Sequence, residues 1–341
     1  MLNLSMHLRS FAVALMALTL QASTAFAQTP AEFYKGKTVR VIVSTTAGGG
    51  YDLRARLLAR YMGKYIPGNP NLVVENMPGG GSVVAMNYTY NVAPHDGTAI
   101  CMFQRSIFTT PLLTPQGVKF DLARFNWLGN VGAENGVVAV WHDAPARTTE
   151  ELFSKEVIVG MPGATVIPTV FNALIGTKFK IINGYPGQAE IITALERGEV
   201  QGVGEWSWSD LKTNRSDWLR DKKINLLLQI ATIKSKELPD VPLAQQFAKN
   251  DEDRKILDIF TSQRQLAFPL VLPPDTPADR VKALRDAFMK VAGDADYIAD
   301  MQKLGAEVDF TSGEQATEFV QKTFGALSPE LAVRINAFGI R

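Results

Sequence analysis

Two runs of three glycines are the residues of this sequence best suited to binding a ligand. The first run, 48–50, follows the β-branched segment 39–43, and the second run, 79–81, follows the apolar segment 72–75. Loops without side chains allow several backbone N–H groups to converge on one oxygen atom, and the N-terminus of a following helix adds partial positive charge. The two runs therefore predict a site for a carboxylate. Tight turns between strand and helix, without a ligand, are the alternative.

Polar side chains beside these runs could complete the site. Thr46 and Ser82 could each donate a hydroxyl hydrogen bond to a ligand, although Ser82 is equally well placed to cap the helix that follows it. Asp52 would repel an anion, so we expect it to cap its own helix or to orient a water molecule or a ligand hydroxyl. Arg105 follows a strand and could pair with a second carboxylate in bidentate geometry, with a solvated surface arginine as the alternative.

Two tryptophans in the second half of the chain could add an aromatic wall. Trp206 and Trp208 alternate with Glu205 and Ser207, and this spacing predicts both indoles on one face at a strand end. Such a wall suits a ring-bearing ligand, whereas buried core tryptophans are the alternative. Glu205 disfavours an anionic pocket unless it pairs with a cation.

Enzymatic functions find little support in the sequence. The run 48–53 lacks the third spaced glycine of a dinucleotide fingerprint, and the run 79–82 lacks the lysine of a phosphate loop. His95 and His142 lie in turn-like segments far from any nucleophile motif, and Cys101 belongs to an apolar, strand-like run. We therefore expect no catalytic residue, no metal site and no cofactor.

Repeated strand-to-helix units must position these residues. The strand 39–43 leads into the first glycine run and a helix, and the strand 72–75 leads into the second run and a helix that reaches about Val92. A third strand, 99–103, ends just before Gln104. Because parallel sheets gather such strand ends on one edge, we expect the three loops to meet there.

The same pattern returns in the second half of the chain. Strands are expected at 136–141 and 156–161, and the segments 162–165 and 185–187 each open a helix. The segment 268–274 has proline near both ends and is therefore expected to be extended. Helices after it carry apolar stripes that need a sheet to cover, and the first sheet is the natural candidate.

The start of the chain is typical of an export signal. Arg9 precedes the apolar run 11–20 and the small-residue site 25–27, so we expect cleavage after Ala27 and a periplasmic mature protein. The remaining chain is long enough for two domains. Its Lys and Arg residues total 35 against 34 Asp and Glu, so no net field favours nucleic acid or an anionic membrane surface.

Four stretches of this sequence resemble the receptor family of the tripartite tricarboxylate transporters, also called Bug-type periplasmic solute-binding proteins. They are 48–52 with 56–60, then 74–82, then 93–98, and finally 185–187 ahead of 198–200. Two departures stand out. Ala47 replaces the proline that usually precedes the first glycine motif, and the loop 160–165 is not the serine-rich version common in the family.

The resemblance implies an α/β fold of the Venus-flytrap kind, with a mixed or parallel sheet in each of two lobes. The chain would cross between the lobes near Trp127 and Arg264, so that 28–130 and 265–341 form the first lobe and 131–264 the second. The implied function is periplasmic binding of a dicarboxylate, tricarboxylate or aromatic acid by lobe closure, and delivery to membrane transporter subunits by a monomer. A ligand-binding sensor for a two-component signalling system is the alternative.

In this family the ligand is held largely by main-chain groups and bridging waters. The ligand-binding residues expected here are Thr46, Gly48, Gly49, Gly50, Tyr51, Asp52, Gly79, Gly80, Gly81, Ser82, Gln104, Arg105, Gly163, Ala164, Thr165, Tyr185 and Trp206.

Overall fold

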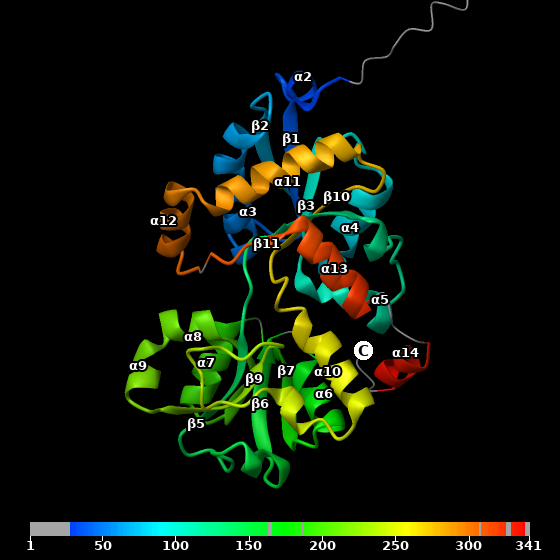
Figure 1. Ribbon diagram of the computed structural model, residues 1–341. Helices are drawn as coiled ribbons and strands as arrows, with labels where there is room; N and C mark the ends of the chain where they lie inside the picture. The colour runs from blue at the N-terminus through cyan, green and yellow to red at the C-terminus, as the bar shows by residue number, and fades with distance from the viewer. Residues whose placement is uncertain (1–27, 163–165, 186, 307, 325–328, 338–341) are drawn as a thin grey trace, which may run out of the picture.

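The computed structural model shows two α/β lobes joined by crossing segments (Figure 1). It describes residues 28–162, 166–185, 187–306, 308–324 and 329–337. The predicted leader, 1–27, lies outside these ranges. Within them, no helix is long and apolar enough to cross a membrane.

The first lobe is built on a six-stranded mixed sheet. Its strands are β1 (Thr38–Val43), β2 (Asn71–Asn76), β3 (Ala99–Met102), β4 (Asn126–Asn130), β10 (Pro269–Leu272) and β11 (Thr311–Ser312). They lie in the order β11-β4-β10-β3-β1-β2. β1 is parallel to both β2 and β3, whereas β10 is antiparallel to β3 and β4. The predicted strands at 39–43, 72–75 and 99–103 therefore exist, with ends that differ by one residue.

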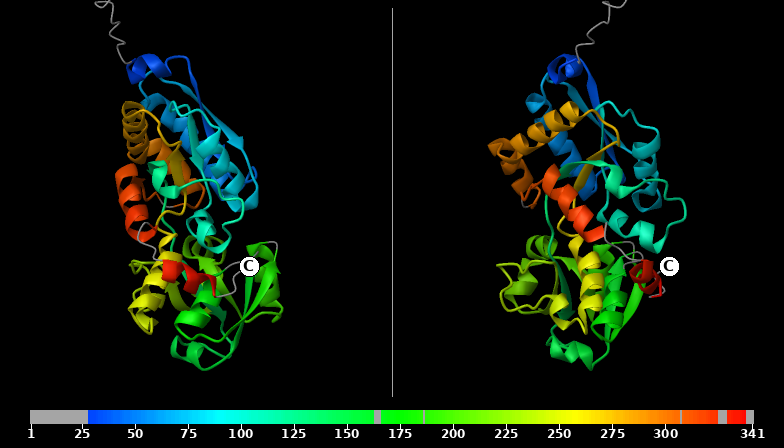
Figure 2. Two further views of the ribbon diagram at one scale, coloured as in Figure 1. Left: turned by 90° about the vertical axis from the view of Figure 1, so that its right-hand side faces the viewer. Right: turned by 45° about the vertical axis from the view of Figure 1, so that its right-hand side comes forward.

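Helices cover both faces of this sheet (Figure 2). They are α2 (Pro30–Tyr34), α3 (Gly50–Met62), α4 (Val83–Asn91), α5 (Thr110–Leu113), α11 (Ala278–Ala292), α12 (Ala295–Lys303) and α13 (Gly313–Phe324). Alternate side chains of β1 point to opposite faces, as a strand requires. Val41 packs with Leu284 of α11 on one face, and Ile42 packs with Met86 of α4 and Ala316 of α13 on the other.

The second lobe contains a five-stranded mixed sheet. Its strands are β5 (Gly136–Trp141), β6 (Val157–Pro162), β7 (Phe179–Tyr185), β8 (Gly202–Ser207) and β9 (Ile224–Ile230), in the order β7-β6-β8-β5-β9. Its helices are α6 (Ile167–Leu174), α7 (Gln188–Glu196), α8 (Trp208–Asn214), α9 (Ser216–Arg220) and α10 (Asp251–Ser262). β6 is parallel to β7 and β8, and β5 is antiparallel to β8 and β9.

Short 3₁₀ turns connect several of these elements. They are η1 (Gly63–Tyr65), η2 (Gly80–Ser82), η3 (Arg105–Phe108), η4 (Leu122–Arg124), η5 (Glu150–Phe153) and η6 (Ala244–Phe247). Two of them, η2 and η3, lie at the edge of the first lobe that faces the second.

Hydrogen bonds tie the two crossing segments, 131–135 and 263–268, to each other. The buried Asn130 side chain donates to the carbonyl of Gly132 at 2.9 Å and to that of Gln265 at 3.1 Å. It also accepts the backbone N–H of Phe268 at 2.8 Å. The backbone N–H of Glu134 donates to the carbonyl of Arg264 at 2.8 Å. The crossing region is therefore a pair of hydrogen-bonded segments and not two loose linkers.

The last helix, α14 (Pro329–Asn336), packs against α5 of the first lobe and also against the second lobe (Figure 1). Ile335 is fully buried in the same apolar cluster as Ile256 of α10, and Arg334 pairs with Asp253 of that helix. Sequence analysis places the whole tail with the first lobe. The described part of the tail ends where the two lobes meet, because α14 contacts α5 of the first lobe and buries Ile335 in the apolar cluster of the second.

Candidate functional site

Both glycine loops lie at the edge of the first lobe that faces the second. Val43, at the end of β1, is in register with Asn76 of β2 and Met102 of β3. The loops that follow these strands are therefore neighbours. The sheet brings together the first run, 48–50, the second run, 79–81, and Gln104, as the sequence predicts.

The backbone of the second glycine run adopts angles that L side chains avoid. The φ angles are 142° at Gly79, 55° at Gly80 and 59° at Gly81, so a side chain at any of them would be strained. All three residues are exposed, and among the hydrogen bonds of the described residues none uses the N–H of Gly80 or Gly81. This loop therefore presents backbone donors to solvent.

The first glycine run is partly occupied by the protein itself. Asp52 is buried and accepts the backbone N–H of Gly48 at 2.8 Å. It also accepts from Nε of Arg56 at 2.9 Å and from Nδ2 of Asn76 at 2.9 Å. The helix α3 begins two residues before Asp52, so the carboxylate reaches back to the loop from the first turn. Gly48 precedes the N-cap residue Gly49, and no side chain caps α3, so Asp52 closes the glycine loop and does not cap its helix as expected.

The charge of Asp52 is fixed by these partners. The hydrogen bond from Arg56 is the largest influence, and with those from Gly48 and Asn76 it outweighs burial and lowers the pKa of Asp52 to about 2. The ionised carboxylate joins the first glycine loop to β2. It thereby fixes the two loops relative to each other.

Ser82 is buried in a left-handed conformation, with φ at 86°. Its hydroxyl donates to Oγ of Ser44 at 2.7 Å and accepts the backbone N–H of Gln104 at 3.2 Å. The side chain does not cap α4, so the capping alternative is wrong. Ser82 instead links the ends of β1 and β3 beneath the loops. Thr46, by contrast, is exposed.

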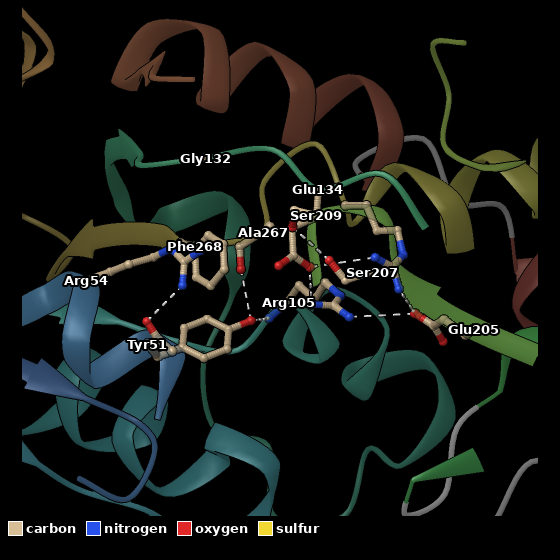
Figure 3. Close-up of polar contacts among 12 residues, drawn as sticks. Tyr51, Arg54, Arg105, Gly132, Glu134, Glu205, Ser207, Ser209, Ala267 and Phe268 are labelled. Atoms are coloured by element: carbon tan, nitrogen blue, oxygen red, sulfur yellow. Dashed lines mark hydrogen bonds and ion pairs between the residues drawn. The ribbon is translucent and has the colours of Figure 1, made fainter. Parts of the chain in front are cut away.

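Four charged side chains gather where the lobes meet, and Figure 3 shows three of them. Nη1 of Arg105 lies 3.2 Å from Oε2 of Glu134, and Nη2 lies 3.6 Å from Oε1 of Glu205. Arg264 pairs with the same two carboxylates, at 3.6 Å to Glu134 and in a close contact with Glu205. We call these residues the hinge cluster. It joins the first lobe, both crossing segments and β8 of the second lobe.

Burial and charge act in opposite directions within the hinge cluster. Burial raises the pKa of Glu205, but the guanidinium groups of Arg264 and Arg105 outweigh it and hold the pKa below its usual range. Burial lowers the pKa of Arg105, but Tyr51, Glu134 and Glu205 outweigh it and raise the pKa. All four groups are therefore best treated as a compensated set of two cations and two anions.

The hinge cluster changes the interpretation of Arg105. Its guanidinium group already has carboxylate partners on the protein, so Arg105 is not a solvated surface arginine, which was the alternative interpretation. A ligand carboxylate would have to share or replace one of them. Sequence reasoning did not identify Glu134 and Arg264, although the requirement that Glu205 find a cation was a signal that such a partner exists.

Tyr51 connects the first glycine loop to the crossing segments. Its hydroxyl donates to the carbonyl of Ala267 at 2.9 Å and accepts the backbone N–H of Arg105 at 3.2 Å (Figure 3). Burial raises the pKa of Tyr51, so the phenol stays neutral and able to donate. Tyr51 therefore lies beside the hinge cluster and supports it.

The two tryptophans do not form a shared wall. Trp206 is 1% exposed, packs against Trp218 in the core of the second lobe and donates its indole N–H to Asp210 at 2.6 Å. Contrary to the sequence expectation, it does not line an open cleft in this structure. Trp208 is partly exposed, and its indole N–H donates to Glu237.

The remaining predicted contacts come from the second lobe. Tyr185, at the end of β7, is partly buried and packs on the same apolar cluster as Ile191. Gly163, Ala164 and Thr165 lie outside the described residues. The side of the site formed by the second lobe is thus described only in part.

Comparisons with known proteins agree with this architecture. A family model described as the tripartite tricarboxylate transporter family receptor matches residues 55–329. The chain is 27% identical over 324 residues to the "UPF0065 protein in gbd 5'region" of Cupriavidus necator. This alignment covers 92% of this chain and 91% of that protein.

Solved structures share the fold. A TctC solute-binding protein from Polaromonas, without ligand, superimposes with a TM-score of 0.69 at 19% identity and covers 89% of this chain and 99% of its own. MatC from Rhodopseudomonas palustris, with bound malate, gives a TM-score of 0.59 at 20% identity and covers 89% of this chain and 98% of its own.

Proposed function

We propose that this chain captures a small carboxylate between its two lobes and delivers it to a membrane transporter, because it belongs to the tripartite tricarboxylate transporter receptor family. Members of this family are periplasmic solute-binding receptors and not enzymes. Export through the leader 1–27 and binding as a monomer belong to the same proposal.

The observation that carries this proposal is the pair of glycine loops at one edge of the first lobe. Gly80 and Gly81 expose backbone N–H groups that have no acceptor among the described residues, and converging backbone donors suit a carboxylate. Malate, the ligand of the solved MatC structure, is a carboxylate. We include Thr46 and Gln104 in the proposed site and leave out Trp206, because its indole is buried in the core.

Binding would favour the closed arrangement of the lobes. We take 28–130 with 265–341 as the first lobe and 131–264 as the second, and α14 packs against both lobes. A carboxylate held by the loops of the first lobe and by β-strand ends of the second makes more contacts when the lobes are closed, so it stabilises that arrangement. The transporter would then recognise the closed shape.

A thermal-shift screen of residues 28–341 tests the ligand class. A ligand that binds only the folded protein raises the melting temperature by mass action. We expect a rise with one class among monocarboxylates, dicarboxylates, tricarboxylates and aromatic acids, and none with sugars or amines. A rise confined to uncharged compounds would contradict the proposal.

Gly80→Val tests the loop assignment. The side chain would occupy the loop surface and would be strained at a φ of 55°, so we expect the ligand-induced thermal shift to disappear. Gly36→Val is the matched control, because Gly36 is also exposed, with φ at 70° and no atom near the added side chain, but lies in the turn before β1. Each variant should lose about 1–2 kcal/mol of folding free energy, and only Gly80→Val should lose binding.

A further inference from the structure

A pocket with a volume of about 670 Å³ is lined by residues of both lobes, and neither glycine run nor Gln104 is among its lining residues. Its walls come from the crossing segments, from the segment 231–237 after β9, and from residues 309–319 around β11 and α13. β11 and β9 lie at the opposite ends of their sheets from β2 and β7, whose loops belong to the proposed carboxylate site. We call this the rear pocket.

Cations without carboxylate partners line the rear pocket. Arg54 of α3 makes one hydrogen bond, from Nη1 to the carbonyl of Gly50 at 3.2 Å, and no ion pair with any described residue. Lys234 and Lys236 line the opposite wall and are likewise outside the ion pairs of the described chain. Burial lowers the pKa of Arg54 more than the nearby Glu134 and Tyr51 raise it.

The acidic groups of the rear pocket mostly have partners already. Glu134 pairs with Arg105 and Arg264, and Glu237 pairs with Lys212 at 2.7 Å. Asp309 is the acidic lining residue for which the described residues provide no cation. Within the described part of the chain, three cations and one carboxylate of the lining thus have no ion-pair partner, and this excess favours an anionic ligand.

Apolar surface accompanies this charge. The guanidinium group of Arg54 lies 3.8 Å from the ring centroid of Phe268 (Figure 3), and Phe310 and Phe319 also line the pocket. Ile233 lines the pocket too and is 73% exposed, so its aliphatic surface is available to a ligand. An inorganic anion would bury none of this apolar surface.

We propose that the rear pocket is a second binding site, for an organic acid with an apolar body, distinct from the carboxylate site at the glycine loops. The carboxylate binds Arg54, with Lys234 and Lys236 contributing positive potential, and the body packs against Phe268, Phe310 and Ile233. An arginine beside an aromatic ring is suited to this combination, because the guanidinium group binds a carboxylate while its face stays on the ring.

Trp208 lines the rear pocket and supplies the readout. We would titrate residues 28–341 with 4-phenylbutyrate and phenylacetate and follow tryptophan fluorescence. The expected result is a saturable change that disappears in Trp208→Phe. Inorganic phosphate and benzyl alcohol, which offer the charge or the ring alone, should give no saturable change in the millimolar range.

Charge variants assign the response to the rear pocket. Arg54→Gln should weaken 4-phenylbutyrate binding about tenfold or more, the usual effect of losing a hydrogen bond to a charged group. Arg60→Gln, further along the exposed side of the same helix, should bind as the wild type, and so should Gly80→Val. The exposed pair Lys234→Gln and Lys236→Gln provides a second test that does not disturb the core.

Several results would overturn this proposal. They are the absence of a saturable response to either acid, an equal response to phosphate, and full binding by both Arg54→Gln and the double lysine variant. Loss of the response in Gly80→Val with retention in Arg54→Gln would assign the acid to the glycine loops instead.

Discussion

Asp52 joins the first glycine loop to the end of β2 through its charge, and its protonation should be visible in protein stability. Its pKa is about 2 in the folded protein and near 3.8 in the unfolded chain. A depressed folded pKa means that the stabilisation is complete above the unfolded value and is lost as the pH falls through it toward 2. The shift corresponds to about 2 kcal/mol.

We therefore expect Asp52→Asn to be about 2 kcal/mol less stable than the wild type at neutral pH, with the difference shrinking between about pH 4 and pH 2. Urea unfolding at a series of pH values measures this directly. Asp279→Asn is the control, because Asp279 is also in the first turn of a helix but is exposed. A gap between wild type and Asp52→Asn that stays constant across this pH range would refute the assigned network.

Among the helices, α14 makes the most distinctive prediction, because it packs where the two lobes meet. Ile335 is fully buried against the second lobe, so Ile335→Ala should destabilise the protein by about 2–4 kcal/mol. Val333 is on the same helix and is 70% exposed, so Val333→Ala should change stability by less than about 0.5 kcal/mol. Chemical unfolding of both variants makes the comparison, and equal small effects would mean that α14 is not docked.

The elements were predictable wherever a local pattern determined them. Apolar, β-branched runs ahead of a glycine loop predicted β1 and β2 to within one residue at each end. Each of these strands pairs with a neighbouring strand whose own sequence shows the same pattern. The docking of α14 was not predictable in this way. Its apolar residues 331 and 335 fit either lobe, and only the packed structure shows which surface receives them.

Only the side of the candidate site that the first lobe contributes could be predicted from the sequence. Glycine loops at strand ends are a local signal, so the edge of the first lobe could be inferred. The hinge cluster could not, because Arg105, Glu134, Glu205 and Arg264 are scattered over the chain and meet only when two sheets face each other. Charged residues give no periodic signal that pairs them across such distances.

At the scale of the whole molecule, the hinge cluster bears on the balance between open and closed lobes. Arg105 belongs to the first lobe, and its contact with Glu205 of β8 at 3.6 Å spans the interface between the lobes. In the proposed closure of the lobes, such a contact would stabilise the closed arrangement. A ligand then has to contribute less free energy in favour of closure, because the contact has already reduced the free-energy difference between the open and closed arrangements.

Arg105→Gln should therefore expand the ligand-free protein. The variant removes a cation that holds Glu134 and Glu205, so we expect a larger radius of gyration by small-angle X-ray scattering, and a return to the wild-type value when the carboxylate found in the thermal-shift screen is added. Arg285→Gln is the matched control, because Arg285 bonds the carbonyl of Trp127 and pairs with Glu314, both within the first lobe. Each variant should lose about 1–3 kcal/mol of stability, yet only Arg105→Gln should change shape. If its ligand-free scattering superimposes on that of the wild type, the hinge cluster stabilises the fold but does not hold the lobes together.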